Sequence, residues 1–117
     1  MGGGVTIYHN PKCGTSRTVL GLIEAAGVTP QTVLYLEAGW SEATLVRLLK
    51  RAGARPRDWL RLRGTPAEAL GLTGPAAADA DILAAMVAHP VLVERPVVET
   101  PKGVRLCRPA ETVRDLL

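Results

Sequence analysis

The first 36 residues alternate between strand-like and helix-like patterns, and this alternation restricts the fold more than any other feature of the sequence. Residues 5–8 form a short run rich in β-formers, and the breaker Asn10-Pro11 follows it. Between residues 15 and 26 apolar side chains recur at helical spacing, and Gly27 supplies a stop. Residues 32–36 form a second β-rich run. This order predicts a strand–helix–strand unit with parallel strands and a right-handed crossover.

The middle of the chain is more helical. Ser41 is a good N-cap for a helix that carries leucines on one face, and Gly53 ends that helix. Pro56 can open a short helix. A capping box with proline at the first helical position predicts a helical turn over residues 65–71. Periodic apolar residues predict a further helix over residues 79–88.

Strand patterns return near the C-terminus. Residues 97–100 and 104–107 flank Pro101-Lys102-Gly103, a connector typical of a hairpin, and Pro109 then opens a last helix. The whole order predicts an α/β fold: a four-stranded mixed sheet with helices on both faces, the middle helices forming an insertion. No repeat, low-complexity tract or linker interrupts the chain. We therefore expect a single domain over residues 1–117.

Composition excludes two classes of partner. The net charge is +3, and 11 of the 14 basic residues are arginine. This excess is too small for nucleic-acid binding, which needs a dense basic stripe, and aromatic residues for stacking bases are scarce. The longest apolar run, residues 82–88, falls well short of the roughly 18 residues of a membrane span. Arginine is, however, the preferred residue for bidentate contact with small oxyanions.

The cysteines and the N-terminal residues suggest a compartment. Cys13 and Cys107 lie far apart in the sequence and match no zinc or CxxC spacing. No signal-peptide pattern opens the chain, because an apolar segment follows directly after Met1-Gly2-Gly3-Gly4. We expect free thiols, a cytoplasmic location, no bound metal or cofactor, and a monomer.

Cys13 lies in the loop that joins the first strand to the first helix. Such a loop places the thiol beside the unpaired backbone N–H groups that open the helix, and these groups stabilise an anion. Lys12 and Arg17, with His9 as a further candidate, would add positive charge and lower the pKa of the thiol. The pattern thus favours a reactive thiolate. The alternative, from spacing alone, is an inert buried thiol at a turn.

The same loop would hold a tetrahedral oxyanion over the sulfur. Gly14 would let a ligand approach the backbone closely. Thr15 and Ser16 offer hydroxyl donors next to it. These residues are therefore candidates for substrate binding.

The loop carries a resemblance to a known family. Residues 7–17, Ile-Tyr-His-Asn-Pro-Lys-Cys-Gly-Thr-Ser-Arg, resemble the active-site loop of the glutaredoxin-coupled bacterial arsenate reductases. The likeness continues in order through Leu34-Tyr35-Leu36-Glu37, Leu70-Gly71-Leu72, His89-Pro90, Glu94-Arg95-Pro96-Val97-Val98 and Leu106-Cys107-Arg108-Pro109. It implies a thioredoxin-like fold. The chain ends after the last predicted helix while well-known members continue further, and we expect activity to survive without that tail.

The resemblance implies roles for individual residues. It makes Cys13 the nucleophile that attacks arsenic and His9 a histidine that assists it. It makes Arg61, Arg95 and Arg108 the three arginines that hold the oxyanion; Arg63, close to Arg61, is a possible substitute for it. Arg95 and Arg108 each precede proline, so both should lie in extended backbone at element boundaries. The fold family also predicts a cis peptide bond at Arg95-Pro96.

The implied reaction is nucleophilic and then redox. The Cys13 thiolate would form an arsenic–sulfur adduct with arsenate, and the arginines would offset the developing negative charge. Ser16 stands where a CxxC motif would have its second cysteine, so an external thiol must resolve the adduct. The resemblance names glutathione as co-substrate, with another low-molecular-weight thiol as an option. Arsenite would leave, and glutaredoxin would resolve the remaining mixed disulfide.

Two rival functions share the fold. One is a redox-sensing regulator, whose relatives typically carry two close cysteines. The other is a monothiol glutaredoxin-like carrier, which needs a glutathione groove but no arginine triad. If Arg95 and Arg108 pointed to solvent instead of to the Cys13 sulfur, the reductase hypothesis would fail. Cys107 is interpreted as a strand residue and not a resolving thiol.

Overall fold

The computed structural model describes residues 4–117, which group into two compact units. The first unit contains the described residues up to Ala38 together with Arg95–Leu117. The second unit contains Gly39–Glu94. The chain therefore leaves the first unit after the short helix that follows its second strand, and it re-enters this unit just before its third strand.

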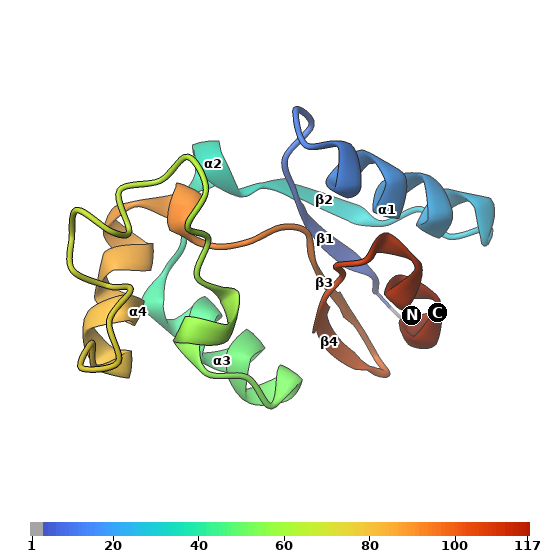
Figure 1. Ribbon diagram of the computed structural model, residues 1–117. Coiled ribbons are helices and arrows are strands. Elements are labelled where there is room, and N and C mark those ends of the chain that lie inside the picture. The colour runs from blue at the N-terminus through green and yellow to red at the C-terminus, as the bar shows by residue number, and fades with distance from the viewer. Residues whose placement is uncertain (1–3) are drawn as a thin grey trace. The chain divides into compact units, whose positions relative to one another are not determined.

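The first unit is built on a four-stranded mixed sheet with the strand order β2-β1-β3-β4 (Figure 1). β1 (Thr6–His9) pairs in parallel with β2 (Gln31–Leu34), as the strand–helix–strand pattern predicts. β3 (Val97–Thr100) pairs antiparallel with both β1 and β4 (Gly103–Leu106). The predicted hairpin is confirmed, and so is the mixed four-stranded sheet.

One hydrophobic core joins this sheet to two helices. α1 (Gly14–Ala25) packs against the C-terminal 3₁₀ helix η3 (Ala110–Leu116), which is red in Figure 1. The core contains side chains of β1 and of the residue before it, of β3, α1 and η3, and the thiol of one cysteine: Val5, Ile7, Val19, Ile23, Val98, Cys107, Ala110, Val113 and Leu116. Aliphatic packing of this kind suits a chain with few aromatic residues. This core holds α1 against the sheet, and it therefore also fixes the loop that precedes α1.

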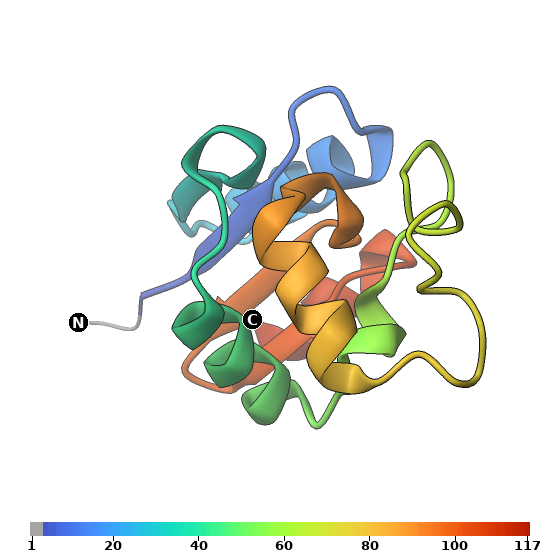
Figure 2. The same ribbon diagram turned by 90° about the vertical axis from the view of Figure 1, so that its left-hand side faces the viewer.

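The second unit consists of short helices (Figure 2). α3 (Glu42–Ala52) begins after Ser41, whose side chain accepts a hydrogen bond from the Thr44 backbone N–H, and ends at Gly53 in the left-handed region. α4 (Asp79–Ala88), orange to yellow in Figure 2, packs against α3 and against the 3₁₀ helices η1 (Pro56–Trp59) and η2 (Pro90–Leu92). The caps and the periodicity predicted α3, η1 and α4 correctly, whereas η2 was not predicted.

Two segments differ from the sequence-based expectation. The second strand ends at Leu34, and Tyr35–Ala38 form the short helix α2, because β1 ends at the paired His9 and leaves Tyr35 without a ladder partner. Residues 65–71 form a single helical-type turn, in which the Leu70 N–H donates to the Pro66 carbonyl at 2.9 Å, but without the predicted capping box. There the Thr65 hydroxyl accepts from the Ala67 backbone N–H, which is a single N-cap contact.

Two X-Pro peptide bonds are cis. Arg95-Pro96 is cis, which confirms the expectation from the fold family, and Arg108-Pro109 is cis as well. Within residues 4–117, no helix combines the length and the apolar character needed to cross a membrane.

Candidate active site

Cys13 is the N-cap residue of α1 and is held there by backbone contacts of its loop. Its N–H donates to the Asn10 carbonyl at 3.0 Å, and its own carbonyl accepts from the Arg17 N–H at 3.0 Å. The Lys12 N–H donates to Asn10 Oδ1, also at 3.0 Å. Asn10 thus stabilises the turn twice, as asparagine commonly does two residues before a turn amide. The half-buried thiol consequently sits at the positive end of the α1 dipole.

Two arginines face the Cys13 sulfur. Arg108 Nη1 lies 4.0 Å from Cys13 Sγ, and the Arg95 guanidinium also hydrogen-bonds to this sulfur. The same Nη1 atom of Arg108 donates to the Arg95 carbonyl at 3.0 Å. The β3–β4 pairing places these arginines together, since Arg95 precedes β3 and Arg108 follows β4. Both guanidinium groups point at the thiol and not to solvent, so the arrangement that a reductase requires is present.

The pKa of Cys13 is lower than that of an ordinary cysteine. Burial of the thiol raises this pKa, but the backbone N–H of Ser16 and the guanidinium groups of Arg95 and Arg108 together lower it by more. The sequence-based expectation named other charges, and here it is wrong. Lys12, Arg17 and His9 are not among the groups that lower the pKa; the Arg17 guanidinium donates instead to the Pro11 carbonyl at 2.9 Å.

His9 supports the loop from inside. Its Nδ1 lies 2.6 Å from Ser16 Oγ, which also accepts from the Asn10 N–H at 3.1 Å. All three residues are buried. Burial lowers the pKa of His9, and the charge of Arg17 lowers it further, so the neutral imidazole is favoured. A role of His9 in assisting Cys13 stays a prediction; the contact that the structure shows is the one with Ser16.

The three residues after Cys13 differ in what they can offer an oxyanion. Gly14 is exposed, and a Cβ added there would lie 3.8 Å from Arg17 Nη2, an ordinary contact. Thr15 is half-buried. The Ser16 side chain is fully buried and its hydroxyl is already hydrogen-bonded, so the part of Ser16 available to an anion is its backbone N–H.

Arg61 belongs to the second unit. Its Nη1 forms an ion pair with Glu94 at 2.8 Å, and its Nε donates to the Arg63 carbonyl at 3.1 Å. Its backbone N–H donates to the Leu92 carbonyl, next to the Leu60–Val93 bridge. Arg63 itself is exposed. A role of Arg61 in oxyanion binding stays a prediction, and the Glu94 pairing was not anticipated from the sequence.

Cys107 is a core residue. It is fully buried, and burial raises the pKa of its thiol to about 11. Both cysteines are free thiols. The prediction that Cys107 is a strand residue is wrong by one position, because β4 ends at Leu106. A thiol that keeps its proton and is covered by core side chains is poorly suited to thiol exchange, which agrees with the expectation that Cys107 is not a resolving thiol. Within the described part of the chain, no cluster of three or more His, Cys, Asp or Glu residues could hold a metal ion.

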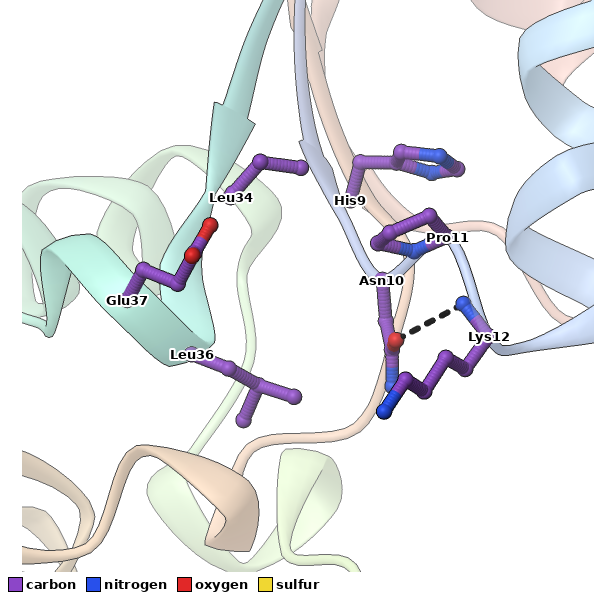
Figure 3. Close-up of a pocket in the computed structure, with 7 residues that line it drawn as sticks. All are labelled: His9, Asn10, Pro11, Lys12, Leu34, Leu36 and Glu37. Atoms are coloured by element: carbon purple, nitrogen blue, oxygen red, sulfur yellow. Dashed lines mark hydrogen bonds between the residues drawn. The ribbon is translucent and has the colours of Figure 1, made fainter.

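A pocket of about 280 Å³ opens beside the Cys13 loop (Figure 3). Residues of the loop and its preceding strand line one side: His9, Asn10, Pro11 and Lys12. Residues from the end of β2 and from α2 line the other: Leu34, Leu36 and Glu37. The sequence did not predict this pocket, because it exists only where α2 replaces the expected end of the second strand.

A mixed sheet of this order, with a cysteine at the N-terminus of the first helix and an arginine facing its sulfur, is typical of a thioredoxin-like thiol protein. The chain belongs to the ArsC family, whose model matches residues 8–116. Over 113 residues it is 55% identical to arsenate reductase ArsI2 of Synechocystis, an alignment that covers 97% of this chain and 81% of the relative. It is 46% identical to an arsenate reductase of Escherichia coli, with 97% and 80% covered.

The comparison with solved structures agrees. The arsenate reductase from Vibrio cholerae superposes with a TM-score of 0.91 at 39% identity, covering 97% of this chain and 98% of that one. The resemblance inferred from the loop and the Arg-Pro motifs is therefore confirmed at the level of family and fold.

Proposed function

We propose that this chain reduces arsenate to arsenite through an adduct on Cys13. The observation that carries the proposal is a thiol of lowered pKa, at a helix N-terminus, faced by the guanidinium groups of Arg95 and Arg108. This arrangement combines a nucleophile with an anion site, which is what attack on an oxyanion requires. The relatives named arsenate reductase support arsenate as that oxyanion.

Arsenate would bind over the Cys13 sulfur. Arg95 and Arg108 would grip two of its oxygens, and Arg61 is proposed as the third arginine. The backbone N–H groups of Gly14 and Ser16 and the hydroxyl of Thr15 would take the remaining oxygens, as helix N-termini do for phosphate. These contacts would strengthen as arsenic is attacked and negative charge grows on oxygen.

The proposed chemistry balances in two steps. The Cys13 thiolate attacks arsenic, a hydroxyl group of arsenate leaves as water, and an S–As(V) bond forms. The thiol of a co-substrate, glutathione or another low-molecular-weight thiol, then attacks the Cys13 sulfur. The S–As bond pair passes to arsenic, which leaves as arsenite, As(III), while the two sulfurs become a mixed disulfide. Glutaredoxin would restore Cys13 by thiol–disulfide exchange.

The remaining parts of the proposal follow from this chemistry. Because the reaction consumes free thiols and both cysteines are unpaired, we place it in the cytoplasm. All steps use side chains, substrate and thiols, so no metal or prosthetic group is needed. We propose that both units of the chain act as one catalytic domain and that a monomer suffices.

Coupled turnover tests the proposal. NADPH oxidation would be followed with arsenate, glutathione, glutathione reductase and glutaredoxin, for the wild type, for Cys13→Ser and for Cys107→Ala. We expect turnover in the wild type and in Cys107→Ala, and none in Cys13→Ser. If Cys13→Ser retained turnover, Cys13 would not be the nucleophile. If the wild type had no turnover although its thiol titrated below the ordinary pKa, a thiol-carrier function would replace the reductase.

The role of Arg61 needs its own comparison. Arg61→Gln is expected to raise the KM for arsenate at least about tenfold, a loss typical of one charge-assisted contact. Arg63→Gln, a change at an exposed neighbour, is the matched control and should leave KM unchanged. If both variants changed the KM for arsenate equally, Arg61 would not be a residue of the oxyanion site.

A further inference from the structure

The pocket beside the Cys13 loop is not used by the chemistry proposed for arsenate. Arg95 and Arg108 hold the oxyanion at the sulfur, and neither lines this pocket. Its volume of about 280 Å³ lies just below the range of about 300–1,000 Å³ common for ligand sites. It is therefore large enough for part of a small ligand.

The pocket carries opposite charges on its two sides. Figure 3 shows the Lys12 side chain on the loop side and Glu37 across from it on α2. Both residues are exposed. Within residues 4–117, neither the Lys12 ammonium group nor the Glu37 carboxylate forms an ion pair in the structure. Each charge is therefore free to meet a ligand group of the opposite sign.

The side of the pocket that carries Glu37 also exposes apolar surface. Leu34 and Leu36, two of the five large hydrophobic side chains exposed on the described surface, lie there with 38% and 44% of their surfaces accessible. Figure 3 shows Leu34 directed toward His9 across the pocket. A ligand with a methylene chain would cover these leucines and remove apolar surface from water.

The pocket adjoins the nucleophile. Lys12 is bonded directly to Cys13, and consecutive Cα atoms are about 3.8 Å apart. An extended tripeptide spans about 10 Å. A ligand of that length with one end in the pocket could therefore present a central thiol to the Cys13 sulfur.

We propose that this pocket binds the thiol co-substrate, and that the co-substrate is a low-molecular-weight thiol carrying both a carboxylate and an ammonium group, as glutathione does. Lys12 receives the carboxylate and Glu37 the ammonium group, while Leu34 and Leu36 cover the intervening methylene groups. This assignment rests on the proposed function for its role in turnover. It favours a charged, amino-acid-like thiol over a neutral one.

Bound in this way, the thiol is placed for the second step. Its sulfur gives up a proton and attacks the Cys13 sulfur, the S–As bond breaks, and arsenic takes the electron pair. The products are arsenite and the mixed disulfide. Because the arginines hold arsenate and this pocket holds the thiol, the two substrates bind to different residues of the protein.

Binding can be measured without arsenate. The probe is S-methylglutathione, which cannot form a disulfide, titrated into the full-length Cys13→Ser protein and followed by amide NMR shifts. We expect shifts at Lys12, Leu36 and Glu37, and a weakening of about three- to fivefold in Glu37→Gln, the size expected for one partly exposed ion pair. Glu24→Gln, at an exposed glutamate of α1, is the matched control. Shifts confined to residues far from the pocket and the Cys13 loop, or no binding by the folded protein, would overturn the proposal.

Turnover with two thiols separates this proposal from the reductase function. Lys12→Gln and Glu37→Gln should each raise the KM for glutathione about three- to fivefold and leave the KM for arsenate unchanged. With 2-mercaptoethanol, which has neither charge, both variants should behave like the wild type. If the variants slowed both thiols equally, the pocket would not recognise charge and the proposal would fail. If S-methylglutathione bound as expected but arsenate was never reduced, the site would stand and the reductase function would fail.

Discussion

The acidity of Cys13 depends on two opposing effects at one sulfur. Burial favours the neutral thiol, whereas the Ser16 N–H and two guanidinium groups favour the thiolate. Since the second effect is larger, the protein keeps a nucleophile population above that of a free cysteine, which is only a few per cent ionised near neutral pH. Arg95 and Arg108 therefore stabilise the Cys13 thiolate in the absence of any oxyanion.

The first prediction concerns this acidity. The rate of Cys13 alkylation by iodoacetamide, followed against pH, should rise with a midpoint below the pKa of an ordinary cysteine. Arg95→Gln and Arg108→Gln should each shift that midpoint upward, because each removes a positive charge that stabilises the thiolate. Arg114→Gln, at an exposed arginine of η3, is the control. An unshifted midpoint in both site variants would contradict the assignment.

The second prediction concerns Ser16. Its hydroxyl satisfies the Asn10 N–H and His9 Nδ1 in a buried place, so Ser16→Ala leaves both groups without this partner. We expect a loss of about 1–3 kcal/mol in the free energy of unfolding, measured by urea denaturation. Thr18→Ala, which removes the hydroxyl of an exposed residue of α1, should cost less than about 0.5 kcal/mol. Similar losses in the two variants would show that the His9–Ser16 contact is unimportant for stability.

At the scale of elements, capping decides where α3 begins and ends. The Ser41 side chain accepts from the Thr44 N–H at 3.1 Å, and Gly53 adopts φ = 65° at the other end. We predict that Ser41→Ala lowers the free energy of unfolding by about 1 kcal/mol, while Ser41→Asp, which keeps an acceptor, changes it little. Urea denaturation measures both. A loss in Ser41→Asp as large as in Ser41→Ala would indicate that the side-chain cap is not what stabilises α3.

Local signals predicted most of the elements. Ser41 and Gly53 bound α3, and Asn10-Pro11 ends β1, because capping and turn formation depend on neighbouring residues. α2 was missed because Tyr35 and Leu36 have strand-like side chains; whether they extend a strand depends on whether β1 offers partners, and β1 ends at His9. The intrinsic strand propensity of a residue does not indicate whether a neighbouring strand is long enough to pair with it.

The candidate site, like the fold, was predicted from the sequence only in part. The loop motif and the two Arg-Pro pairs predicted that Cys13, Arg95 and Arg108 act together, and the structure brings these three side chains into contact. The supporting contacts of Asn10 and Ser16 could not be predicted in the same way, although Asn10-Pro11 signalled a turn. Which cation lowers the pKa of the thiol depends on where side chains point, so nearness in sequence misassigned it to Lys12 and Arg17.

At the scale of the whole molecule, the two cysteines have opposite chemistry because the fold surrounds them differently. Cys13 sits at a helix N-terminus among cations, whereas Cys107 is enclosed by the core that joins the sheet to α1 and η3. Burial raises the pKa of Cys107 to about 11, so the folded state holds that proton more tightly than the unfolded state does.

This difference makes a prediction about alkaline stability. Below pH 9, the ordinary pKa of the thiol, the folded and the unfolded protein both keep the Cys107 proton, and stability is not reduced. As pH rises from there toward about 11, the unfolded protein loses this proton first, so the free energy of unfolding falls. We expect the wild type to lose more free energy of unfolding between pH 8 and 11 than Cys107→Ala, although the variant starts lower because of its cavity. Urea denaturation across this pH range measures the difference. Parallel pH curves would show that Cys107 is not protonated more tightly in the folded protein.

The central claim is that arsenate becomes arsenite through a covalent intermediate on one sulfur, Cys13. The most direct test is the intact mass of the protein after it reacts with arsenate and glutathione in the absence of glutaredoxin. We predict one added glutathione, located at Cys13 by peptide mapping, in amounts equal to the arsenite formed. The adduct should be absent without arsenate and absent in Cys13→Ser. Arsenite formed without any modification of Cys13, or an adduct at Cys107 instead, would contradict the account.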